Sequence, residues 1–243
     1  MRPHFSEGLP LVKAVPSFIL RRQTRRSLCA VSLQKILKSL PNLQSMKYEP
    51  WRDFFRLPRY IQDPYYQKTI FMSLPEALRT LTVFEDFNEG YNIVHFDAKG
   101  LLEACQPGWM WANLETLTLT SKLLPLYKPR PVAINKMLVK AGTAAIWMPR
   151  FQNMVIWNGL KRHACAFRYQ VTANSTTLGW CGTWELELDI DVLDVWGEVA
   201  LRHTRNELSV LASRSIDKQD IQSHAAAIRE LNLSEVISPI SLE

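Results

Sequence analysis

His163, Cys165 and Cys181 come nearest to a reactive cluster in this sequence of 243 residues. Imidazole and thiolate are both zinc ligands, and a Cys–His pair can act as a nucleophile with its base. However, residues 165–172 and 177–188 alternate apolar and polar side chains, which predicts an antiparallel β-hairpin. In that hairpin Cys165 lies on the apolar face and Cys181 on the polar face. We therefore predict no disulfide, no metal site and no catalytic cysteine.

Three aspartates, Asp189, Asp191 and Asp194, follow the hairpin. They resemble an acidic site, but Asp189 is also a good N-cap for a helix that carries Leu193 and Trp196 on its apolar side. Nine glycines are scattered over the chain and form no Gly-rich phosphate loop. We therefore expect a protein that is not an enzyme and that needs no cofactor.

A repeated pattern of apolar residues must form the framework that positions any binding residues. Stretches beginning at Leu43, Leu78, Leu114 and Phe151 read apolar, two variable residues, apolar, one variable residue, apolar, and their starts lie 35, 36 and 37 residues apart. Residues 15–20 have the same spacing. A fixed period of this size indicates stacked units that share one core, although βα units of a doubly wound sheet have a similar length.

The pattern predicts an α/β fold, namely a degenerate leucine-rich-repeat-like solenoid with a parallel sheet, followed by a β-hairpin and helices. We expect a repeat region over residues 1–159 and a hairpin-plus-helix domain over residues 160–243, packed on the repeats. The parallel strands should lie in chain order near residues 17–20, 45–48, 80–83, 116–119 and 153–156.

Helices are expected at residues 27–40 and 134–146, where apolar residues recur with helical spacing. In the hairpin, Thr172 is expected opposite Thr177. A short strand should follow at residues 207–211, and Asp217 should cap the last amphipathic helix.

The variable positions of the repeated strands should line the concave face of the sheet, which solenoids use as a binding surface. Reading across the strands, the first column holds Ser17, Ser45, Thr80, Thr116 and Asn153, the second holds Ile19, Lys47, Thr82, Thr118 and Val155, and the third holds Arg21, Glu49, Phe84, Thr120 and Trp157. Thr and Val also simply suit a pleated surface. The aromatic pair Phe84 and Trp157 is more typical of a contact patch, and it should be exposed. The predicted binding residues are Arg21, Lys47, Glu49, Phe84, Thr118, Asn153 and Trp157.

Composition limits the class of protein. Apolar residues make up 47% of the chain, enough for a sizeable core, and no run approaches 18 consecutive apolar residues, so we expect no membrane span. The four cysteines lack CxxC spacing, which favours a reducing compartment, cytoplasmic or nuclear. Residues 1–40 hold eight basic residues against one acidic residue, but no aromatic residues interleave with the cluster at 21–26, so we do not expect nucleic acid as the partner.

Several strings resemble the C-terminal region of fungal F-box-type proteins with degenerate leucine-rich repeats. They are FILRRQTRR at residues 18–26, LPNLQSMKYEPWR at 40–52, residues 148–159, and the hairpin from FRYQVT to GTWELEL. The resemblance extends over nearly the whole chain. In that family an F-box binds the adaptor of a ubiquitin ligase and the repeats receive a substrate. Residues 1–10 are too few for an F-box, so we do not expect this chain to bind the adaptor.

The resemblance therefore implies a non-catalytic protein-recognition module, with an unknown protein ligand on the concave sheet face. Two alternatives stay open: a small intracellular enzyme with a pocket between the repeats and the C-terminal domain, and a truncated fragment of a longer protein.

Overall fold

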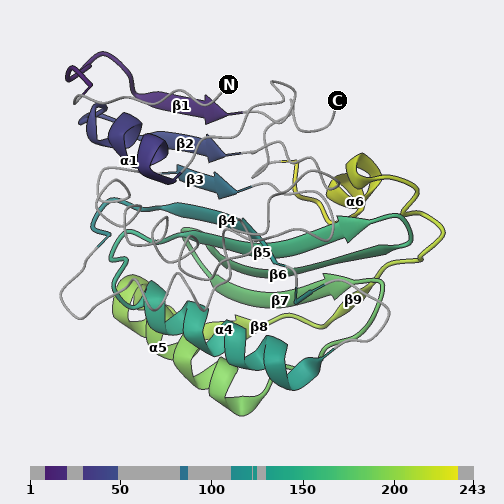
Figure 1. Cartoon of the computed structure of the whole chain (residues 1–243). Coiled ribbons are helices and arrows are strands. Elements are labelled where there is room, and N and C mark those ends of the chain that lie inside the picture. Colours follow the sequence, from purple (N-terminus) through teal and green to yellow (C-terminus); the bar gives the residue numbers. More distant parts are fainter. Residues whose placement is uncertain are drawn as a thin grey trace.

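The structure is a computed structural model that describes residues 9–20, 30–48, 83–86, 111–121, 123–124 and 130–234. Within these residues one nine-stranded sheet runs through the molecule, with helices on both of its faces (Figure 1). The fold is therefore a mixed α/β fold, as predicted. None of the helices within the described ranges is long and apolar enough to cross a bilayer.

One half of the sheet is parallel. Its strands are β1 (Ser17–Leu20), β2 (Ser45–Tyr48), β3 (Val83–Asp86), β4 (Thr116–Thr120) and β5 (Asn153–Leu160). They pair in chain order, each parallel to the next. The predicted order and direction of these five strands are confirmed.

The predicted register holds at both ends of the parallel half and fails at β3. Leu117 is aligned with Met154 as the spacing required, but Met46 is aligned with Phe84 instead of Leu81. The sequence favours Leu81, because Leu78, Leu81 and Val83 satisfy the whole pattern, whereas the observed register puts Asp86 in the third apolar position, aligned with Tyr48. An odd shift exchanges the faces of a strand. Phe84 is therefore in one row with Met46 and Leu117, and the predicted row with Thr120 and Trp157 is wrong for this residue.

The other half of the sheet begins with antiparallel strands. β6 (His163–Val171) pairs with β5 and with β7 (Thr176–Gly182), so the predicted hairpin does extend the sheet. Val171 faces Thr176, which is two residues from the expected pairing of Thr172 with Thr177. The shift arises because Thr172 and Ser175 close the turn, with Thr172 N donating to Ser175 O at 2.8 Å. An even shift keeps every side chain on its predicted face.

Two short strands complete the sheet. β8 (Leu208–Val210), predicted at residues 207–211, and β9 (Arg214–Ser215) both pair with β7 in parallel. The predicted boundary between residues 159 and 160 falls near the end of β5, and the strands on both sides of it belong to one sheet.

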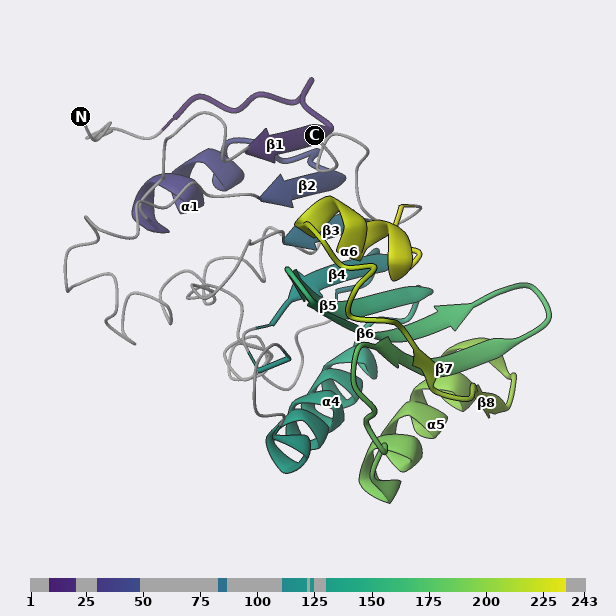
Figure 2. The ribbon, with the colours of Figure 1, turned by 90° about the vertical axis from the view of Figure 1, so that its right-hand side faces the viewer.

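The inner face of the sheet, which carries Met46, Leu117, Met154 and Phe167, is covered by three helices. These are α1 (Ala30–Lys38), α4 (Pro131–Ala145) and α5 (Ile190–Thr204). α4 begins with proline, which suits the first helical position, and α5 follows Asp189 as predicted, although the Asp189 side chain makes no capping hydrogen bond. Figures 1 and 2 show α4 and α5 side by side below the sheet.

The outer face, which carries Ile19, Lys47, Thr118, Val155 and Trp157, is covered at one end by α6 (His224–Glu230; Figure 2). The N-cap of α6 is Ser223, whose Oγ accepts from Ala226 N at 3.1 Å. The prediction that Asp217 caps this helix is wrong. Its carboxylate instead accepts from Gln219 N at 2.8 Å in a turn that precedes the helix.

Candidate functional site

The predicted binding residues do not form one patch within the described structure. Arg21 and Glu49 lie outside the described residues, and of Phe84 the structure describes only the backbone. Lys47 and Asn153 are half-buried on the outer face, whereas Thr118 and Trp157 are buried there.

Trp157 is 0% exposed, so its predicted role as an exposed contact residue is wrong. The cause is a second hydrophobic core on the outer face, which the C-terminal segment from Ile216 to Leu233 forms with Val155, Trp157 and Ala166. The Trp157 indole lies 5.0 Å from the His224 ring, centroid to centroid. The sequence signal for this cover is the amphipathic pattern of the last helix, whose apolar side needs an apolar surface such as that of Val155 and Trp157.

The contact between α6 and β5 is close because position 159 is glycine. A Cβ placed on Gly159 would come within 2.5 Å of the Ala227 Cβ and 3.3 Å of the Trp157 ring. The Gly159 carbonyl accepts a hydrogen bond from His224 Nδ1 at 2.8 Å. Because a carbonyl only accepts, Nδ1 carries the proton in this contact.

Two arginines of the sheet hold the C-terminal end of α6. Arg168 on β6 donates to Asn232 O at 2.6 Å and to Leu231 O at 3.4 Å, and Arg214 on β9 donates to Glu230 O. The carbonyls at a helix C-terminus lack partners within the helix and carry partial negative charge. The guanidinium groups satisfy both needs, so this end of the outer face serves to bind the chain's own C-terminal segment.

Thr118 is also unavailable for contact with a ligand. It is 1% exposed, between Glu85 of β3 and Val155 of β5, and its Oγ1 has no hydrogen-bond partner among the described residues. Its predicted place on an open surface is wrong, because its side chain is buried.

The outer face remains open at its other end, over β1 and β2. Ser17 is exposed, Ile19 is 48% exposed, and Ser45 and Lys47 are half-buried. These four residues are aligned as Ser17 with Ser45 and Ile19 with Lys47, so they form one compact group, which we call the β1–β2 patch. Among the strands that the structure describes, β1 pairs with β2 alone.

The cysteine cluster is divided between the faces, as predicted. Cys165 is aligned with Gly182 and Ala166 with Cys181, so the two thiols lie on opposite faces, and both cysteines are free. Burial raises the pKa of the Cys165 thiol well above its usual range, which opposes formation of a nucleophilic thiolate. Its Sγ donates to Leu124 O at 3.2 Å. Within the described residues no group of three or more His, Cys, Asp or Glu is placed to hold a metal ion.

The neighbouring His163 is partly buried at the start of β6. Burial, followed by the positive charges of Lys218 and Arg162, lowers the pKa of its imidazole. Both nearby charges are repulsive to an imidazolium, so this histidine favours the neutral form.

Comparison with known proteins gives one match. A family model described as a family of unknown function matches residues 92–238, which is more than half of the chain. No curated protein and no solved structure matches the chain.

Proposed function

We propose, given that the chain belongs to the family of unknown function DUF6546, that it is a non-catalytic protein-recognition module similar to the substrate-receptor part of fungal F-box-type proteins. Its ligand is a protein, and the contact surface is the open end of the outer sheet face. The recognition role follows the resemblance of the strings quoted above, three of which carry the parallel strands β1, β2 and β5.

The observation that carries the proposal is the contrast between the two ends of the outer face. The apolar residues Val155 and Trp157 are covered by the C-terminal segment, whereas Ile19 on the edge strand is 48% exposed. An exposed isoleucine beside serines and a lysine offers apolar contact in a polar surround, which is how small recognition surfaces are composed.

The edge position of β1 adds a second mode of contact. An extended peptide can add to a sheet edge through main-chain hydrogen bonds, while alternate side chains give specificity. A ligand strand beside β1 would meet Ser17 and Ile19 with every second side chain. We therefore propose a ligand with an extended segment that places an apolar residue against Ile19.

The proposal is tested by site-specific crosslinking in the cells that produce the protein. A photoreactive phenylalanine analogue is placed at Ile19 and, as the matched control, at Val210, which is 51% exposed on β8 at the other end of the sheet. We expect a crosslinked protein at Ile19 that is absent at Val210.

The recovered protein is then purified, and its affinity for the unmodified chain is measured. Replacement of Ile19 by Asp should weaken binding at least about tenfold, because a carboxylate then replaces a buried apolar contact. Val210→Asp should leave the affinity unchanged. Equal crosslinking at both positions, or the same affinity for both variants, would show that the β1–β2 patch is not the recognition surface.

A further inference from the structure

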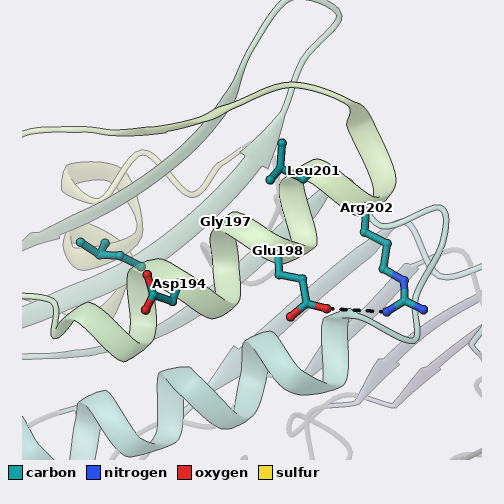
Figure 3. Close-up of a pocket in the computed structure, with 6 residues that line it drawn as sticks. Asp194, Gly197, Glu198, Leu201 and Arg202 are labelled. Carbon is teal, nitrogen blue, oxygen red and sulfur yellow. Dashed lines mark ion pairs between the residues drawn. The ribbon is translucent and has the colours of Figure 1, made fainter.

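We draw no further inference here: the strongest candidate, the shallow depression on the exposed side of α5 between Asp194 and Arg202 (Figure 3), carries no proposal because nothing in the part of the chain that the structure describes shows what covers this helix face.

Discussion

At the scale of single residues, Tyr169 is the clearest case of a polar group buried at a cost. It is 0% exposed between Phe151, whose ring is stacked at 6.2 Å, and Trp196, at 4.8 Å. Its hydroxyl has no hydrogen-bond partner among the described residues. An unsatisfied buried polar group costs about 1–3 kcal/mol.

We therefore expect Tyr169→Phe to stabilise the protein, by about 1 kcal/mol or more in the free energy of unfolding, measured with urea at pH 8. The matched control is Phe167→Tyr on the same face of the same strand, which adds a hydroxyl to a residue that is 0% exposed and should destabilise the protein. A loss of stability in Tyr169→Phe would show that the hydroxyl does have a partner.

Tyr169 should also make the free energy of unfolding depend on pH in the alkaline range. Burial raises the pKa of Tyr169 from 10 to about 12. Between these values the tyrosine ionises in the unfolded chain but stays protonated in the folded one, so the free energy of unfolding must fall as the pH rises from about 10 to about 12. The unmodified chain should thus lose more stability between pH 9 and pH 11 than Tyr169→Phe does.

Replacement of Trp157 should lower the free energy of unfolding, the opposite of the change expected for Tyr169→Phe. Replacing this fully buried residue by Ala should cost about 3–5 kcal/mol of the free energy of unfolding, because it leaves a cavity under α6. Trp147→Ala, at a position 37% exposed, should cost much less. Equal losses in the two variants, measured by urea unfolding at low protein concentration, would mean that α6 does not cover Trp157 in solution.

At the scale of elements, α6 depends on side chains of the sheet beneath it. Replacing Arg168 by Met keeps an unbranched side chain but removes the hydrogen bonds to Leu231 and Asn232. Hydrogen bonds of charged groups contribute about 1.5–3 kcal/mol, and we expect the lower end because this arginine is half-exposed.

The effect should be local and visible by hydrogen exchange. Amides of α6 should exchange faster in Arg168→Met, while those of α4 and α5 on the inner face should not change. Arg229→Met is the control, because Arg229 is exposed on α6 itself. Unchanged exchange in α6 after the Arg168 replacement would contradict the role of this arginine.

The order and direction of the strands could be predicted from the sequence, but the segments that cover each face of the sheet could not. Apolar spacing gave the order and direction of β1 to β5, because the residues that face the inner core, such as Leu117 and Met154, must recur in register. It did not predict that Phe84 is aligned with Met46, because that register puts Asp86 at a position where the spacing calls for an apolar residue. Nor could periodicity show that Trp157 is buried, because an apolar residue on the second face of a strand fits a binding surface and a second core equally well.

At the scale of the whole molecule, one sheet joins the two predicted regions. β5 and β6 are aligned over eight residue pairs from Asn153–Gln170 to Leu160–His163, and α4 and α5 share one core. A division at residues 159 and 160 would leave both parts with unpaired strand edges and exposed apolar faces.

We therefore expect residues 1–159 and 160–243, produced separately, not to fold. The intact chain should show cooperative unfolding in which the far-UV circular dichroism and the tryptophan fluorescence change together. A well-dispersed amide spectrum from either fragment alone would contradict this expectation and favour two independent domains.

The C-terminal cover also fixes an order of events during synthesis. The sheet strands through β7 leave the ribosome before the segment that covers Val155 and Trp157, because that segment extends to Leu233. For this interval the nascent chain displays an apolar sheet surface with no partner, which is the kind of surface that binds chaperones or aggregates. Translation that stalls between Thr204 and Ile216 would leave a chain in which the inner core can form while the outer face stays bare. The segment from Ile216 to Leu233 is thus made after the strands whose apolar outer face it covers.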